Sequence, residues 1–179
     1  MTTAPLVSHA KKTITILPVM ERDAVLQAGL LSLWEMSVRK THLFLSEDAI
    51  SELKPAVLQG IVHVSRLFVA TDENRVILAF MGIDADKIEM LFVSPPFFGM
   101  GIGKTLVYHA IVNQQVRRVD VNEQNPQATG FYEHCGFQVK GRSSCDDQGN
   151  PYPILHMALP ADFTTSRAYK LISGVSDAS

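Results

Sequence analysis

Residues 93–106 read Val93-Ser94-Pro95-Pro96-Phe97-Phe98-Gly99-Met100-Gly101-Ile102-Gly103-Lys104-Thr105-Leu106, with three alternating glycines at the start of a predicted helix. Amide groups at a helix start have no partner within the helix, and the helix dipole adds positive charge there. Because glycine lacks a Cβ atom, a ligand can approach this backbone closely. The segment therefore predicts an anion site, and a phosphate-bearing ligand is the first functional expectation.

Three phosphate-binding patterns compete for this segment. A Walker A loop requires glycine five residues before Gly103, but that position holds Phe98. The dinucleotide fingerprint G-x-G-x-x-G requires glycine where this chain has Lys104. The order Val-x-Pro, then Gly-x-Gly-Ile-Gly-Lys-x-Leu, resembles the acetyl-CoA loop of the GNAT N-acyltransferase superfamily, with Gly101 and Gly103 at its two small residues. A glycine-rich helix start that binds no ligand is the remaining alternative.

A second segment supports the same resemblance. Residues 121–137 read Val121-Asn122-Glu123-Gln124-Asn125-Pro126-Gln127-Ala128-Thr129-Gly130-Phe131-Tyr132-Glu133-His134-Cys135-Gly136-Phe137 and are similar to the GNAT pattern Asn-x-x-Ala-x-x-x-Tyr-x-x-x-Gly-Phe. The spacing between the two segments also fits that family, and the resemblance runs from about Thr13 to Leu159. The stretch Trp34-Glu35-Met36-Ser37-Val38 and residues 146–153 further resemble the YjaB-type branch of small bacterial acetyltransferases.

The periodicity of apolar residues predicts an α/β chain with a mixed sheet of about seven strands and helices on both faces. Two short turns join three strands into an antiparallel meander, and a strand–helix–strand unit adds a parallel crossover, which the resemblance describes as a splayed pair. The expected strands are Thr13–Leu17, Arg66–Thr71, Arg75–Ile83, Ile88–Val93, Arg118–Asn122, Phe137–Arg142 and Ile154–Ala158. The expected helices are Arg22–Lys40, a helix capped by Ser46 that runs toward Leu53, a further short piece from Pro55, Gly103–Gln115 and Pro126–Cys135.

Composition and charge narrow the class of protein. The 179 residues are 46% hydrophobic and 19% charged, which excludes a disordered or fibrous chain. A net charge of −2 provides no basic field for nucleic acid or a membrane surface, and no apolar run is long enough for a membrane span. Two cysteines, Cys135 and Cys145, favour a reducing compartment, and the N-terminus lacks a signal-peptide pattern. We therefore expect a cytoplasmic monomer or homodimer.

The domain organisation follows from length and from the extent of the motifs. One domain is expected for a chain of this length. We assign residues 13–159 to a single GNAT acyltransferase domain and residues 1–12 to a flexible N-terminal tail. Residues 160–179 are expected to form a loose C-terminal appendage, although Tyr169, Leu171 and Ile172 could dock on the domain.

The resemblance implies a binding site for acetyl-CoA as the acyl donor. Amides near residues 91–93 are expected to pair with the pantetheine arm as an added strand, and amides of residues 99–104 to hold the pyrophosphate. Phe98 occupies the position where the family usually has Arg or Gln, and Lys104 could compensate as a point charge. The cofactor-binding residues that we expect are Leu91, Phe92, Val93, Phe98, Gly99, Met100, Gly101, Ile102, Gly103, Lys104, Thr105 and Asn125.

The resemblance also implies the catalytic groups. Tyr132 matches the family's general acid, which protonates the departing CoA sulfur, and a core tyrosine is the alternative. Asn125 matches a residue that hydrogen-bonds the cofactor arm, and it is also a suitable N-cap. The attacking amine must be neutral, and Glu89 is the predicted base, with His42 as the alternative. No group of His and Cys residues has zinc-site spacing, so we expect no metal.

The acceptor is expected to be a small-molecule or protein amine. Its site should form from residues 34–45, the meander turns and residues 150–154, with Trp34, His42, Phe44 and Tyr152 as its candidate residues. A single fold can serve many acceptors, so the fold does not select among them. The sequence therefore predicts an N-acetyltransferase that acts by direct attack in a ternary complex. A CoA-binding sensor with little catalysis is the alternative, and a nucleotide triphosphatase is a distant third.

Overall fold

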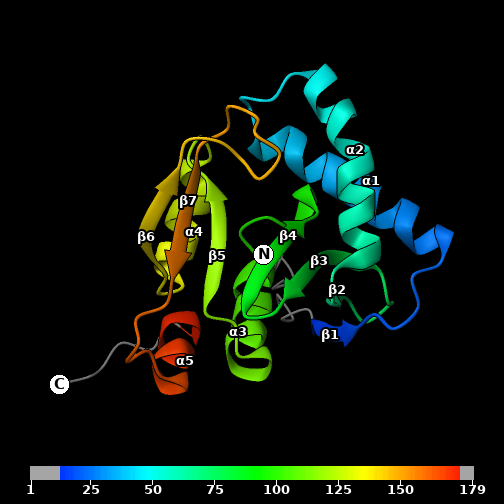
Figure 1. Cartoon of the computed structure of the whole chain (residues 1–179). Helices are drawn as coiled ribbons and strands as arrows, with labels where there is room; N and C mark the ends of the chain where they lie inside the picture. Colours follow the sequence, from blue (N-terminus) through cyan, green and yellow to red (C-terminus); the bar gives the residue numbers. More distant parts are fainter. Residues whose placement is uncertain (1–12, 174–179) are drawn as a thin grey trace, which may run out of the picture.

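A seven-stranded open sheet, in the order β1-β2-β3-β4-β5-β7-β6, organises the chain (Figure 1). The computed structural model describes the backbone of residues 13–173 and the side chains as far as Lys170. The strands are β1 Thr15–Pro18, β2 Arg66–Thr71, β3 Ile77–Asp84, β4 Lys87–Val93, β5 Arg118–Asn122, β6 Gln138–Ser143 and β7 Ile154–Ala158. The helices are α1 Ala24–Thr41, α2 Glu47–His63, α3 Ile102–Gln114, α4 Pro126–His134 and α5 Thr165–Ser173, with the single turn η1 at Pro95–Phe97.

The helices cover the two faces of the sheet unequally. On one face, α1 and α2 pack over β2, β3 and β4, and their core includes the buried side chains of Leu30, Ile61 and Phe80. On the other face, α3 and α4 pack against a larger core that includes Leu106, Val119 and Phe137. The predicted mixed α/β sheet with helices on both faces is confirmed. Within residues 13–173, no helix is long and apolar enough to cross a bilayer.

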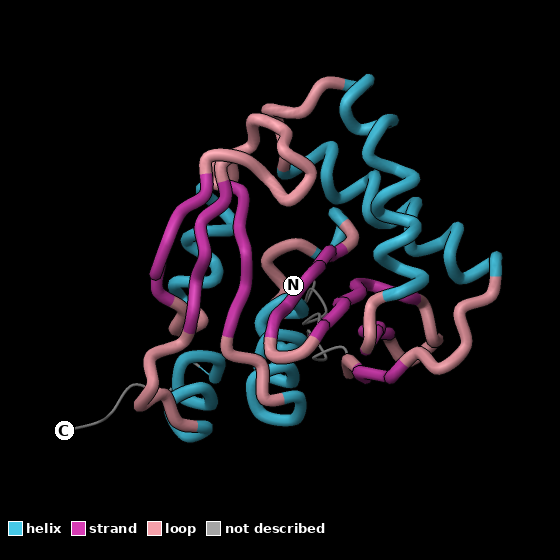
Figure 2. The backbone as a smooth tube through the Cα atoms, viewed as in Figure 1, coloured by secondary structure: helices cyan, strands magenta, loops and turns pink. Residues whose placement is uncertain are grey.

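The parallel pair at the centre of the sheet separates after two residue pairs. Strands β4 and β5 are paired only at Lys87–Arg118 and Ile88–Val119, and Figure 2 shows them diverging from this shared end. On its other side β4 pairs with β3, where the register passes from Ile83–Ile88 to Gly82–Met90. Glu89 therefore has no opposite residue and forms a β-bulge, which bends a strand locally. The bulge coincides with the point where β4 leaves β5.

The structure of α2 differs from the sequence prediction. Helix α2 is continuous and contains Pro55, whereas a break before this residue was predicted. Proline inside a helix removes one hydrogen bond, but Ile50 and Ile61 are both buried on the same core, so packing on either side holds the helix together. As predicted, Ser46 caps this helix, because its hydroxyl accepts a hydrogen bond from the Ala49 amide at 3.1 Å.

The C-terminal segment is folded where it is described, so the prediction of a loose appendage is wrong there. Phe163 and Ala168 are buried in the core beside α3, and the Arg117 guanidinium donates hydrogen bonds to the carbonyls of Pro160 and Phe163. The Tyr169 ring lies 6.4 Å from that of Tyr108, edge to face. The predicted docking of Leu171 and Ile172, and the tail at residues 1–12, concern side chains and residues outside the described part.

Candidate functional site

A cavity of about 510 Å³ opens where β4 and β5 part. Its walls come from the end of α1, residues 88–93 of β4, η1 and the loop that follows it, the start of α3, residues 119–122 of β5, and α4. Because the two strands no longer share hydrogen bonds beyond Ile88, the edge of β4 that faces β5 is open. Leu91, Phe92 and Val93 line the cavity along this edge, and an extended ligand can pair with their backbone there.

The glycine segment supplies a row of unpaired amides at one end of the cavity. Gly99 and Gly101 adopt φ angles of 75° and 81°, a region that favours glycine, and the chain then enters α3. The Thr105 amide makes the first intrahelical hydrogen bond, to the Gly101 carbonyl at 3.0 Å. Among the described residues, no backbone acceptor is found for the amides of residues 101–104, so these donors are available to an anion.

The predicted residues of this segment fall into two groups. Phe98, Gly99, Gly101, Ile102, Gly103 and Lys104 line the cavity, and within the described chain Lys104 has no carboxylate partner. Met100 and Thr105 do not line it: Met100 is half exposed, and the Thr105 hydroxyl donates to the Gly101 carbonyl at 3.0 Å. Gly103 has a packing role, because a Cβ there would lie 3.2 Å from the Phe131 ring.

Tyr132 lies on α4 in the wall of the cavity. Its ring is held edge to face between Phe131 and Phe137, at centroid distances of 5.0 and 5.7 Å. No hydrogen bond to its hydroxyl is found among the described side chains and backbone, so the group is free to meet a ligand. Burial raises its pKa well above the usual range, so the phenol is protonated at neutral pH.

The two residues that cap α4 have distinct roles. Asn125 is the N-cap, and its Oδ1 accepts a hydrogen bond from the Ala128 amide at 3.0 Å while the residue lines the cavity. The capping role is therefore confirmed, and a cofactor contact stays a prediction. Cys135 is buried, and burial raises the pKa of its thiol to about 12, which argues against a nucleophile.

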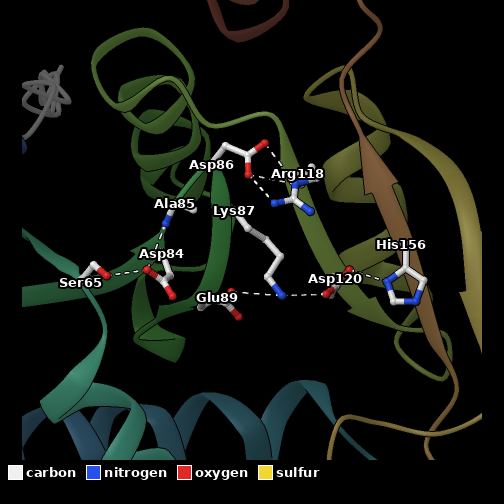
Figure 3. Close-up of polar contacts among 9 residues, drawn as sticks. All are labelled: Ser65, Asp84, Ala85, Asp86, Lys87, Glu89, Arg118, Asp120 and His156. Carbon is white, nitrogen blue, oxygen red and sulfur yellow. Dashed lines mark hydrogen bonds and ion pairs between the residues drawn. The ribbon is translucent and has the colours of Figure 1, made fainter.

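Polar side chains of β4, β5 and β7 form a row of contacts next to the vertex between β4 and β5 (Figure 3). Glu89 lines the cavity, and its Oε1 lies 3.1 Å from the Lys87 ammonium. Lys87 also contacts Oδ2 of Asp120 at 2.9 Å, and Oδ1 of Asp120 contacts His156 Nδ1 at 2.7 Å. Burial raises the pKa of Asp120, but hydrogen bonds from His156 and Lys87 outweigh it, so this pKa lies below its ordinary value. Burial lowers the pKa of Lys87, and its two carboxylate partners more than offset this effect.

The candidate acceptor residues are dispersed. His42, at the end of α1, lines the cavity, and burial lowers its pKa, which favours the neutral imidazole. Phe44 packs between His42 and Tyr152 at centroid distances of 5.5 and 6.0 Å, beside the cavity. Trp34 is 3% exposed in the core between α1 and the sheet, so its expected place in the acceptor site is wrong.

Asp120 lines the cavity and was absent from the sequence prediction. The alternation Val119-Asp120-Val121-Asn122 contains the signal, because both valines are buried and the polar residues must then face the other side of the strand. Ser37, Thr41 and Gln127 also line the cavity, and no motif in the sequence singles them out.

Comparisons with known proteins agree with this geometry. A model of the acetyltransferase (GNAT) domain matches residues 63–139. The peptidyl-lysine N-acetyltransferase YjaB of Salmonella typhimurium is 40% identical over 131 residues, which are 73% of this chain and 90% of that protein. The Escherichia coli YjaB is 40% identical over 129 residues, 72% of this chain and 87% of that protein. The solution structure of apo-form Escherichia coli YjaB matches with a TM-score of 0.72 and 36% identity, covering 82% of this chain and 97% of that one.

Proposed function

The chain belongs to the GNAT family of acetyltransferases, and from this premise we propose that it transfers the acetyl group of acetyl-CoA to the amine of a protein lysine. The acceptor class is suggested by the two YjaB relatives, which are peptidyl-lysine N-acetyltransferases. The observation that carries the proposal is the cavity between β4 and β5, which is lined by donors for an anion, an open strand edge and a protonated phenol.

The residues present fit acetyl-CoA. A Cβ built on Gly99 or Gly101 meets no atom within 4 Å, so open space lies beside a backbone that offers unpaired amides. Lys104 adds a positive charge in the same wall, and this charge suits a pyrophosphate. Phe98, 41% exposed, provides no polar contact, so the backbone and Lys104 would hold the phosphates. When bound, acetyl-CoA supplies the activated acetyl thioester.

In this proposal Tyr132 is the general acid. As the amine nitrogen forms its bond to the acetyl carbon, the bond from that carbon to the CoA sulfur breaks and negative charge develops on the sulfur. The Tyr132 hydroxyl, protonated and unpartnered among the described residues, donates a hydrogen bond and then its proton to that sulfur, and the phenolate regains a proton from solvent as the thiol leaves. Asn125 has its Oδ1 engaged in the helix cap, which leaves its Nδ2 donor to contact the cofactor arm.

The amine must lose a proton before or during attack, and we assign this step to Glu89. Glu89 lines the same cavity as Tyr132, and only one of its carboxylate oxygens has an ion-pair partner among the described residues. His42 is the second candidate, since its imidazole lies in the cavity wall and burial favours its neutral form. A lysine side chain would enter past Phe44 and Tyr152, which lie beside this end of the cavity.

Replacing Tyr132 with Phe tests the acid role. We expect kcat for acetylation of a lysine peptide to fall by about 10²-fold or more, because the proton donor is lost. The dissociation constant of acetyl-CoA should stay within about twofold of the wild type. Tyr108→Phe is the matched control, because Tyr108 lies on α3 outside the cavity. Unchanged turnover in Tyr132→Phe would contradict the assignment.

A CoA-binding module without catalysis is the second candidate, and Phe98 in the usual Arg or Gln position favours it. Wild-type protein that binds CoA but acetylates neither lysine peptides nor small amines would support this alternative. The same binding measurement with ATP distinguishes a nucleotide triphosphatase, which should be stabilised by ATP rather than by CoA.

A further inference from the structure

A chain of polar contacts links four neighbouring strands, and Figure 3 shows the part of it from Glu89 to His156. It begins at Glu89 on β4 and passes through Lys87 to Asp120 on β5, with contacts of 3.1 and 2.9 Å. It continues to His156 on β7, which lies directly opposite Asp120 in the antiparallel ladder and contacts it at 2.7 Å. Ser143 on β6 ends the chain, with its Oγ 2.7 Å from His156 Nε2.

The two carboxylates of this chain are held differently. Asp120 has both oxygens engaged, Oδ2 by Lys87 and Oδ1 by His156. Glu89 has Oε1 engaged by Lys87, and no partner of Oε2 is found among the described residues. Glu89 therefore keeps one oxygen free for a ligand in the cavity, whereas both oxygens of Asp120 are engaged by neighbouring side chains.

We propose that Lys87 and Asp120 are positioning residues for Glu89: Asp120 shares the Lys87 ammonium and thereby controls how strongly that ammonium pairs with the catalytic carboxylate. This inference rests on the proposed role of Glu89 as the base. Contacts from Lys87 and Asp120 matter here because Glu89 forms a β-bulge and has no opposite residue in the strand ladder. Side-chain contacts must then supply the orientation that backbone pairing does not.

Because Glu89 and Asp120 share the Lys87 ammonium, removing either Lys87 or Asp120 should change the protonation of Glu89, which a purely structural role would not do. A nearby cation makes a carboxylate harder to protonate, and a nearby anion makes it easier. Without the charge of Asp120, the whole Lys87 ammonium acts on Glu89 and an adjacent negative charge is gone. Without Lys87, two carboxylates face each other across the vertex with no cation between them. The two changes must therefore move the protonation of Glu89 in opposite directions.

The other charged and titratable groups near Glu89 are few. On β5, Arg118 is paired with Asp86 at 2.9 and 3.1 Å, and its positive charge also acts on Glu89 and Asp120. From α1, His42 lines the cavity, and from α4, Tyr132 does so as a neutral phenol. On β3, Gly82 and Ile83 flank the bulge and carry no charge. These groups are unchanged in both variants.

The experiment compares Asp120→Asn and Lys87→Met by two readouts. The first is kcat/KM for a lysine peptide as a function of pH at saturating acetyl-CoA. We expect its acid limb to move by about one pH unit to lower pH in Asp120→Asn and by about one pH unit to higher pH in Lys87→Met. The titration of the peptide amine is common to all variants and leaves these differences intact.

The second readout is the pH dependence of the Glu89 carboxyl ¹³C shift in the enzyme without acetyl-CoA, assigned with Glu89→Gln. The midpoint of this titration should move to lower pH in Asp120→Asn and to higher pH in Lys87→Met. The measurement does not require activity, so if the protein acetylates no amine, only the proposed function fails. Glu123→Gln is the matched control, because it removes a carboxylate paired to Arg142 outside the cavity and should leave both curves unchanged. The proposal would be overturned if the pH midpoints shifted in the same direction in both variants, or shifted in neither. Thermal unfolding verifies that each variant is folded.

Discussion

Gly82→Ala probes the contact that holds the bulge of β4 in place. Gly82 lies opposite Met90, the residue after Glu89, and a Cβ built on it falls 2.7 Å from Met90 Cγ and 3.1 Å from Met90 Sδ. Real Cβ contacts do not reach 2.7 Å. Met90 Cγ lies near the backbone, so the side chain cannot move aside without displacing the strand. Overpacking of this kind costs about 1–3 kcal/mol.

A double-mutant cycle separates the free-energy cost of the contact with Met90 from the other effects of the Gly82→Ala substitution. In the Met90→Ala background the Met90 atoms are absent and only Val64 Cγ2, 3.1 Å from the built Cβ, remains close, so the cost of Gly82→Ala should fall to about 0.5 kcal/mol or less. The coupling between the two positions should therefore be at least about 0.5 kcal/mol. Urea unfolding at constant pH measures all four proteins, with the slope of each transition checked for constancy.

Two glycines provide controls. Gly60 on α2 faces only the terminal Met90 methyl, at 2.9 Å from a built Cβ, and this methyl can rotate away. Gly60→Ala should therefore destabilise less than Gly82→Ala. Gly29 on α1 has nothing within 4 Å, and Gly29→Ala should stabilise by about 0.5–1 kcal/mol through helix propensity. If Gly82→Ala destabilises equally with and without Met90, the packing argument for the bulge is refuted.

The remaining predictions concern the anion site, acid stability and the C-terminal helix. Gly101→Ala places a side chain at φ 81°, which costs about 1–2 kcal/mol, and calorimetry should show acetyl-CoA binding weakened by about tenfold. The lowered pKa of Asp120 stabilises the fold above its ordinary value of 3.8, and this contribution is lost as the pH falls. Asp120→Asn should therefore flatten the decline in urea midpoint below about pH 4, and an unaltered decline would exclude this residue as a cause. Arg117→Ala removes the donors to the Pro160 and Phe163 carbonyls, and hydrogen exchange should show faster opening of α5 with little change in the sheet.

The local pattern of apolar and turn residues was sufficient to predict most of the strands and helices. The strands Arg66–Thr71, Arg118–Asn122 and Ile154–Ala158 were predicted with the bounds that the structure has. The other four strands were each placed within about two residues, because alternation and turn residues mark them. The continuation of α2 through Pro55 was missed, since it depends on long-range burial of Ile50 and Ile61 rather than on local preference. The docking of Phe163 was missed for the same reason.

The candidate site was predicted where it consists of backbone and motif residues. The glycines were expected from their position at a helix start, and the β4 edge and Tyr132 from the resemblance to the GNAT family. The structure gathers all of them around one cavity. Trp34 was misplaced because an aromatic residue at helical spacing can face either a core or a pocket. The bulge at Glu89 and the contacts of Asp120 arise from the pairing of strands distant in sequence, which no single segment reveals.

The central claim is that this cavity passes an acetyl group from acetyl-CoA to a lysine amine. The most direct measurement incubates the purified protein with acetyl-CoA and a lysine peptide, and follows the acetylated peptide by mass spectrometry, with Tyr132→Phe and peptide-free samples alongside. The account predicts multiple turnovers of wild-type protein, acetylation at the lysine Nζ, and a loss of about 10²-fold or more in Tyr132→Phe. Acetylated peptide formed at the same rate by wild type, Tyr132→Phe and buffer alone would contradict it.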